Sequence, residues 1–330
     1  MRKISIIIVN WNGRKFLDKC ITSLINQSYK NKEIVMVDNN SEDDSIKFVE
    51  KTFKDKVRIV ENVNNGYAGG ANRGIRETTG DFIAIVNPDV VFESDYLSNC
   101  INYFDKNEKV GAISGKLLKY DFDTNEKKNI IDSVGISIKK NRSAYDIGQN
   151  TIDNGQYEIA KRVFAVCGAA SIYRRKFIEK IKFENEYFDE DFFAYKEDID
   201  LCWRLNWIGI ESHYIPNAVA YHGRGMNSAK GLIEFLVNRK KQSSYLQGIS
   251  FRNQYLMIYK NEKFNNMQKD MFKIILRFFQ YIIYFIIFNP SNLKNVKNIW
   301  VIIKKKISRK KQHLLSIKTE DERTIYALFD

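Results

Sequence analysis

The chain has 330 residues, of which 44% are hydrophobic, so it can bury a sizeable core and form one large domain with an additional region. Its formal net charge of +13 suggests a nucleic-acid or membrane-surface partner, and the location of that charge decides between them. The 4 cysteines are far apart and form no Cys-x-x-Cys pair, which argues against a zinc or dithiol redox centre and indicates buried thiols in a reducing cytosol.

The first third of the chain alternates between strand and helix patterns. Apolar, β-branched runs that predict strands cover residues 4–9, 32–37, 57–61 and 81–87. Segments with helical periodicity or helix-start signals follow at 15–27, 41–53, with Ser41 as the expected N-cap, and 64–79. This alternation predicts a parallel sheet covered by helices. The strand ends then bring Asn10, Asp38 and Asp89 to one edge, where α/β sheets bind ligands.

The first strand also bears on localisation. Its apolar run, residues 4–9, is too short for the core of a secretory signal peptide. We therefore expect the protein to work in the cytoplasm.

The middle of the chain is less regular. A helix is expected at 95–107, a strand at 110–120, polar hairpins and loops at 121–157, a strand of small residues at 163–173, a helix at 197–205, and short strands at 210–215 and 218–221. The small residues from Cys167 to Ser171 leave room for close approach to the backbone, either by a ligand or by a packed helix.

From about residue 229 the composition changes. Met271–Phe288 is strongly apolar, but Lys273, Arg277 and Gln280 form one polar stripe on it, which favours an interfacial helix over a membrane-spanning one. Residues 291–318 combine an apolar helical face with lysines and contain no acidic residue. We expect this region to bind an anionic membrane surface rather than nucleic acid. Packing on the sheet domain or on a second subunit, as a homo-oligomer, is the alternative.

Nucleotide-binding loops of the common kinds are absent from the sequence. Gly69 and Gly74 have the outer spacing of a P-loop, but Ile75 and Arg76 stand where Lys and Ser or Thr are required. No Gly-x-Gly-x-x-Gly follows the first strand. What remains is a carboxylate-rich crevice, which is expected to contain Asp38, Asp89, Glu197, Asp198 and His222.

Ordered motifs over residues 4–224 resemble the family 2 inverting glycosyltransferases, and most closely their bacterial rhamnosyltransferase-like branch. The motifs are Ile7-Ile-Val-Asn-Trp-Asn-Gly13, Val37-Asp-Asn-Asn-Ser41, Asn64-Asn-Gly-Tyr-Ala-Gly-Gly-Ala-Asn-Arg-Gly74, Val86-Asn-Pro-Asp-Val90, Lys196-Glu-Asp-Ile-Asp-Leu-Cys-Trp-Arg204 and Tyr221-His222. The resemblance implies an α/β GT-A fold, with a mostly parallel sheet, helices on both faces and a C-terminal helical appendage. Residues 1–228 would be the catalytic domain, with a nucleotide-sugar-binding half at 1–110 and an acceptor and catalytic half at 111–228. Residues 229–330 would be the membrane-associating region.

The resemblance also assigns nucleotide contacts. Asp38 would accept a hydrogen bond from the imide N–H of uracil or thymine. Further nucleotide contacts fall to Val9, Asn10, Asn12, Asn72 and Arg73, and a contact with the diphosphate falls to Arg224.

A divalent cation is the implied cofactor. Asp89 matches the last acid of the family's Asp-x-Asp motif, whereas Asn87 replaces the first acid. His222 would be the second protein ligand, and diphosphate oxygens and water would complete the shell of Mg²⁺ or Mn²⁺. A nitrogen ligand favours Mn²⁺.

Asp198 occupies the family position of the catalytic base, with Glu197 as an orienting or capping group. The implied activity is transfer from a UDP- or dTDP-sugar, dTDP-rhamnose being one candidate, to a saccharide or lipid-linked acceptor. This would serve cell-surface polysaccharide synthesis on the inner face of the membrane. A non-catalytic nucleotide-binding or scaffold protein is the alternative, because Asn87 weakens the metal motif.

Overall fold

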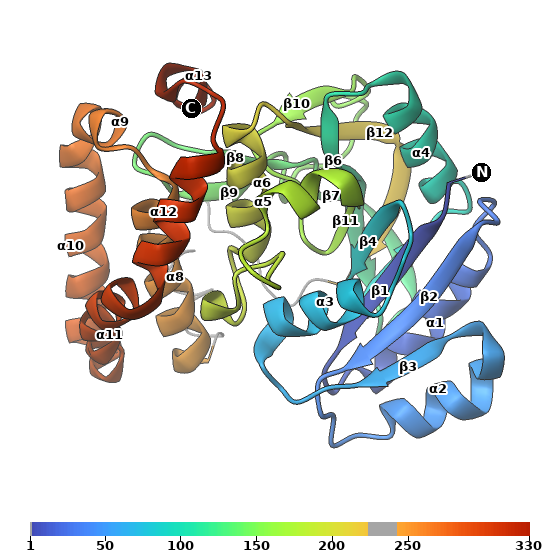
Figure 1. Ribbon diagram of the computed structural model, residues 1–330. Coiled ribbons are helices and arrows are strands. Elements are labelled where there is room, and N and C mark those ends of the chain that lie inside the picture. Colours follow the sequence, from blue (N-terminus) through green and yellow to red (C-terminus); the bar gives the residue numbers. More distant parts are fainter. Residues whose placement is uncertain (1, 224–242) are drawn as a thin grey trace.

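The computed structural model describes residues 2–223 and 243–330 (Figure 1). Arg224 and the expected domain boundary after residue 228 lie outside the described residues. The sheet has the strand order β10-β12-β6-β11-β4-β1-β2-β3, with β5 and β7 paired off this path.

The N-terminal part of the sheet is parallel, as expected. It contains β1 (Ile4–Asn10), β2 (Lys32–Asp38), β3 (Arg58–Glu61) and β4 (Phe82–Val86), which lie in the order β4-β1-β2-β3. The helices are α1 (Arg14–Ile25), α2 (Ser45–Phe53), followed by a 3₁₀ turn at Lys54–Lys56, and α3 (Gly66–Arg76). Alternate residues of β1 pack on opposite faces: Ile6 and Ile8 share a core with α1 and α2, whereas Ile7 and Val9 share one with α3. Helices therefore cover both faces of the parallel strands.

The rest of the sheet is mixed. Here β11 (Ala170–Arg174) runs antiparallel to both β4 and β6 (Val110–Asp121), while β12 (Glu211–His222) runs parallel to β6. Antiparallel edges are added by β5 (Val90–Phe92), β7 (Glu126–Ser133) and β10 (Lys161–Val163). A separate hairpin pairs β8 (Ile136–Ile138) with β9 (Ala144–Asp146). The helices are α4 (Tyr96–Lys106), α5 (Arg175–Ile181) and α6 (Glu197–Trp207), with a 3₁₀ turn at Glu190–Phe192.

Local expectations were wrong at three places. The strand expected at 163–173 is split into β10 and β11, because the small residues between them turn their backbone groups toward neighbouring side chains. The strands expected at 210–215 and 218–221 are one strand, β12, whose register shifts between Ile215 and Val219, around Pro216, which has no N–H to donate. Ser41 does not cap α2, which begins at Ser45, because its hydroxyl bonds to Asp38 instead.

The C-terminal region is helical. It contains α8 (Ser244–Asn261), α9 (Phe264–Lys269), α10 (Met271–Phe288), α11 (Lys294–Ile302), α12 (Ser308–Ile317) and α13 (Glu322–Tyr326). A 3₁₀ turn at Pro290–Leu293 and a π-helical turn at Ile303–Ile307 connect α10, α11 and α12. These helices form a layer on one side of the molecule, with α10 as its outermost member in Figure 1.

Buried polar contacts join the C-terminal helices to α6. The indole Nε1 of Trp207 donates to the carbonyl of Asn261 at 2.9 Å. Lys260 on α8 is buried between Asp189 and Asp200, and its Nζ lies 2.7 Å from Asp200 on α6. Removing one partner of such a buried ion pair destabilises the folded protein, because the other charge is left buried without compensation. The C-terminal helices therefore help to hold the helix that carries Glu197 and Asp198.

The outer face of α10 is apolar and exposed. This helix has 18 residues with a mean hydropathy of 1.8, and 17% of it is buried. Within the part of the chain that the structure describes, it is the one helix that is long and apolar enough to cross a membrane. Its exposed apolar residues are Phe272, Ile275, Leu276, Phe279, Ile283, Ile286, Ile287 and Phe288. Trp300 of α11 is also exposed, as are the neighbouring Lys294 and Lys297. This set of residues is called the α10 face below.

Candidate active site

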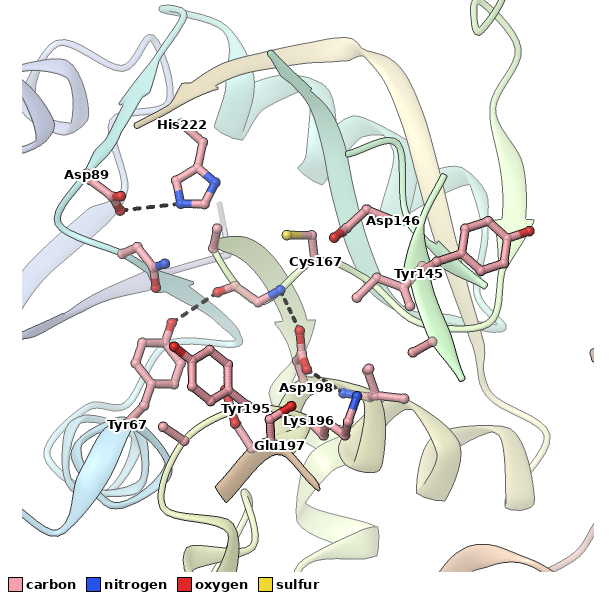
Figure 2. Close-up of a pocket in the computed structure, with 18 residues that line it drawn as sticks. Tyr67, Asp89, Tyr145, Asp146, Cys167, Tyr195, Lys196, Glu197, Asp198 and His222 are labelled. Carbon is pink, nitrogen blue, oxygen red and sulfur yellow. Dashed lines mark hydrogen bonds and ion pairs between the residues drawn. The ribbon is translucent and has the colours of Figure 1, made fainter. Parts of the chain in front are cut away.

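A cavity of about 550 Å³ opens beyond the carboxyl end of β4. The turn after β4, the 167–169 segment, the start of α6, the end of β12, the β8–β9 hairpin and α8 line it. Figure 2 shows Asp89 and His222 on one side of the cavity and Glu197 and Asp198 on another. The fold thus brings together residues that are more than a hundred positions apart in the sequence.

Asp89 and His222 face each other. Pro88 follows the end of β4, so Asp89 lies in the turn at the sheet edge, while His222 is the last residue of β12. The Nε2 of His222 lies 3.4 Å from Asp89 Oδ1, and its Nδ1 lies 2.8 Å from Oδ2 of the buried Asp132. Burial would lower the pKa of His222, but the carboxylates raise it to about 10. Burial raises the pKa of Asp89, but His222 lowers it by more, so that it stays below its usual value.

These residues suit a divalent cation that is shared with a ligand. Neighbouring ligands of one ion at ~2.1 Å stand ~3 Å apart, close to the separation of Asp89 and His222. Within the described residues, no cluster of three or more His, Cys, Asp and Glu side chains could hold a metal by itself. The protein atoms therefore supply an incomplete shell, which oxygens of a bound nucleotide can complete.

Asp198 is held by backbone donors. Its Oδ2 accepts from the N–H of Gly168 at 2.9 Å, and its Oδ1 accepts from the N–H of Ile199 at 2.8 Å. Burial raises the pKa of Asp198 despite these bonds. A carboxylate that is fixed in place and has a raised pKa is suited to accept a proton.

Glu197 precedes it at the start of α6 and is 6% exposed. Its Oε2 is buried and has no hydrogen-bond partner, and burial together with Asp198 raises its pKa to about 8. Glu197 therefore holds its proton at neutral pH. The orienting or capping role expected for Glu197 stays a prediction.

Asp38 belongs to a hydrogen-bonded network at the neighbouring strand ends. Its carboxylate accepts from Asn10 Nδ2, Ser41 Oγ and Ser41 N, each at 2.8 Å, and it is 1% exposed. Asn12 joins the network through its N–H, which donates to Ser41 Oγ at 2.9 Å. These bonds fix the turn after β1 against the turn after β2, as the β1–β2 register requires. The expected contacts of Asn10, Asn12 and Asp38 with a nucleotide base stay predictions.

Asn72 is hydrogen-bonded within the protein, and its expected contact with a nucleotide stays a prediction. It is fully buried, its Nδ2 donates to the carbonyl of Phe188 and to Glu190, and its Oδ1 accepts from the N–H groups of Tyr187 and Phe188. Its role is to fasten the segment before α6 to α3. The side chain next to it, that of Arg73, pairs with Glu77 one turn along α3 at 3.0 Å and does not line the cavity.

Val9 is also a packing residue. Its Cγ1 would lie 2.8 Å from a Cβ placed on Gly70, so the side chain fills the contact between β1 and α3. Only its backbone remains available to a nucleotide.

The sequence model of Glycosyl transferase family 2 matches residues 5–182, more than half of the chain. The chain belongs to this family. The poly-β-1,6-N-acetyl-D-glucosamine synthase of Staphylococcus epidermidis is 24% identical over 220 residues, 66% of this chain and 49% of that protein. The GalNAc(5)-diNAcBac-PP-undecaprenol β-1,3-glucosyltransferase of Campylobacter jejuni is 26% identical over 199 residues, 58% of each chain. An uncharacterized glycosyltransferase of Nostoc is 32% identical over 114 residues, and that match spans 35% of its length.

Solved glycosyltransferase structures share the fold. The structure of GalNAc-T7 with UDP, GalNAc and Mn²⁺ has a TM-score of 0.57 at 14% identity. The match covers 87% of this chain and 57% of the GalNAc-T7 chain. The structure of residues 1–349 of TarS from S. aureus has a TM-score of 0.56 at 13% identity. The match covers 98% of this chain and 90% of the TarS chain. The GT-A fold expected from the sequence is thereby confirmed for this family 2 member.

Several residues in the cavity or directly behind it were missed in the sequence. Asp132 lies in a polar segment that we expected to form hairpins and loops, and Asp146 lines the cavity from the same segment. Tyr195 and Lys196 line the cavity in left-handed backbone conformations, with φ of 71° and 72°. Non-glycine residues adopt positive φ angles only where the surrounding structure imposes them. No pattern in the sequence predicts these angles at Tyr195 and Lys196.

Proposed function

We propose that the protein is an inverting glycosyltransferase that moves a sugar from a UDP- or dTDP-sugar to the hydroxyl of a saccharide or lipid-linked acceptor. The observation that carries this proposal is the shared cavity, in which Asp198 lies across from the Asp89–His222 pair (Figure 2). A base on one side and a diphosphate site on the other is the arrangement that a direct displacement requires.

In this proposal Asp198 accepts the proton of the acceptor hydroxyl on a carboxylate oxygen. The acceptor oxygen forms a bond to the anomeric carbon as the bond from that carbon to the diphosphate oxygen breaks, which inverts the configuration. A cation held by Asp89 and His222 would neutralise the charge on the departing nucleoside diphosphate. The backbone N–H groups of Gly168 and Ile199 keep Asp198 in position.

The acceptor is proposed to enter beside the β8–β9 hairpin. Tyr145, Asp146 and Lys196 line this part of the cavity, together with Ser250 of α8. The C. jejuni relative is named for an acceptor linked to PP-undecaprenol, and the S. epidermidis relative for a polysaccharide product. The two names support a saccharide or lipid-linked acceptor. A role in cell-surface polysaccharide synthesis and dTDP-rhamnose as one candidate donor are parts of the proposal that neither name addresses.

We also propose that the protein works as a peripheral protein on the inner face of the membrane, attached through the α10 face. Apolar side chains such as Phe279 and Ile283 are exposed on α10, and lysines are exposed on α11. Apolar burial combined with attraction to anionic lipids is how interfacial helices bind. Pairing of this face with a second copy of the chain is the alternative.

The deciding experiment incubates the purified protein with a panel of UDP- and dTDP-sugars and candidate acceptors, and measures release of the nucleoside diphosphate. Release from one donor, abolished by EDTA and restored by Mn²⁺ or Mg²⁺, is the expected result. A protein that binds a nucleotide-sugar but releases no diphosphate with any acceptor would instead be the scaffold protein that Asn87 suggests.

A further inference from the structure

Asp132 is a buried carboxylate directly behind His222. It lies near the end of β7, which pairs with β6, and β6 in turn pairs with β12, the strand that ends at His222. Asp132 is fully buried, and its Oδ2 lies 2.8 Å from His222 Nδ1. The other ring nitrogen, Nε2, points to Asp89 at 3.4 Å (Figure 2).

We propose that Asp132 is a positioning residue for a divalent cation, because it holds the His222 ring with Nε2 directed at the site beside Asp89, where a bound cation would take the place of the Nε2 proton. This inference rests on the metal-dependent activity proposed above and deepens it. Asp132 itself does not contact the ion or the substrate; it acts through His222.

The physical reason lies in the chemistry of imidazole. A neutral ring carries its proton on one nitrogen and can ligate a metal only through the other. A carboxylate that accepts from Nδ1–H selects the form in which Nε2 is free, fixes the ring plane and increases the basicity of the ligand. Because the Asp132 side chain is fully buried, its hydrogen bond to His222 is shielded from competing water.

A second observation explains why such support is needed here. Asn87 stands where a further acid would help to hold the ion, and no cluster of three ligands exists among the described residues. His222 must then supply a large share of the protein's hold on the ion. A ring free to rotate would lose that share.

The test measures Mn²⁺ affinity from the electron paramagnetic resonance signal of free Mn²⁺, with UDP present and a protein-free UDP solution as baseline. Asp132→Ala is expected to weaken Mn²⁺ binding ~10- to 100-fold, as loss of such outer partners does at other histidine sites. Mg²⁺ affinity, measured by competition, is expected to fall less, because Mg²⁺ depends less on a nitrogen ligand. A purely structural role would lower both affinities together.

The controls separate the possible outcomes. Asp153→Asn removes a carboxylate that pairs with the largely buried Lys116 at 2.8 Å, and it should leave Mn²⁺ affinity unchanged. Adding Asp132→Ala to His222→Ala should cause no further loss. If His222→Ala itself leaves Mn²⁺ affinity unchanged, the metal site in the proposed function is wrong. If His222→Ala weakens binding but Asp132→Ala and Asp132→Asn do not, only the role of Asp132 is overturned.

A measurement on the unaltered chain covers the case in which these variants do not fold. With ¹⁵N-labelled histidine and Mg²⁺ and UDP bound, long-range ¹H–¹⁵N spectra should place the His222 proton on Nδ1. A proton on Nε2 would overturn the proposal.

Discussion

Gly168 lies directly against the carboxylate of Asp198. A Cβ added at position 168 would meet Asp198 Oδ2 at 2.9 Å and its Cβ at 3.1 Å, while the N–H of Gly168 donates to that same oxygen. The position of the Asp198 carboxylate therefore depends on the absence of a side chain at a position 30 residues before it.

We expect Gly168→Ala to displace Asp198 and lower kcat ~10²-fold, because small misplacements of a reacting group are that costly. UDP affinity should change little, since the Asp89–His222 side of the cavity is not altered. Steady-state kinetics and UDP calorimetry test both parts, and an unchanged kcat would mean that Asp198 does not act from this position.

Asp198→Asn should remove the base while keeping the shape of the site. The expected loss in kcat is ~10²- to 10⁴-fold, with nucleotide-sugar binding retained. Transfer assays with the preferred donor measure the first quantity, and calorimetry measures the second. Near-normal turnover would show that Asp198 is not the base.

Glu197→Gln should change the pH dependence of stability. The folded-state pKa of about 8 exceeds the usual value of 4.5, so between these pH values the folded protein binds a proton that the unfolded chain releases. Stability is therefore lost as pH rises from 4.5 through 8. The variant lacks this group and should be more stable than the parent above pH 8, which thermal unfolding at pH 5 and pH 9 can test. A parallel pH dependence in both proteins would contradict the raised pKa.

Asn72→Ala separates a fastening role from a nucleotide contact. We expect the free energy of unfolding to fall by about 1–3 kcal/mol, because the substitution leaves buried backbone groups of residues 187 and 188 without partners. UDP affinity should stay within twofold. Asn99→Ala, which removes a single bond to the carbonyl of Asn217, is the control. A large loss of UDP affinity without loss of stability would support the nucleotide contact and contradict the fastening role.

Membrane attachment is tested on the α10 face. The triple variant Leu276→Ser, Phe279→Ser, Ile283→Ser removes apolar side chains that are 47%, 55% and 56% exposed and should abolish flotation with phosphatidylglycerol vesicles. Ile159→Ser, at a residue that is 81% exposed outside this helix, should float normally. Sedimentation of both proteins without lipid would show whether a second copy, rather than lipid, covers the face.

The parallel strands were predictable because their signal is local. The run at 4–9 is rich in β-branched residues, which predicts a buried strand, and Pro88 predicts that the strand before Asp89 ends there. Neighbouring residues were therefore enough to predict the strands and the sheet edge at which Asp89 lies. The direction of β11 was not predictable. It is set by how distant strands pair, not by its own composition.

The candidate site likewise combines residues that the local sequence predicted with residues that only the assembled fold brings together. Asp89, Asp198 and His222 lie in motifs with a fixed sequence pattern, and the fold places them in or around one cavity. Asp132 has no such pattern, because its position behind His222 arises only when β7, β6 and β12 assemble. The hydrogen bonds from Asn72 to the segment before α6 were likewise not predictable, because they join residues more than a hundred positions apart.

The β8–β9 hairpin that walls the cavity is completed by the last residues of the chain. Phe329 bridges to Ile138, and the carboxylate of Asp330 accepts hydrogen bonds from Ser137 and Tyr145. Contacts this far apart in sequence form late, because a long loop must close before they stabilise anything. During synthesis on the ribosome, the β8–β9 wall of the cavity therefore stays unfinished until residue 330 has left the exit tunnel.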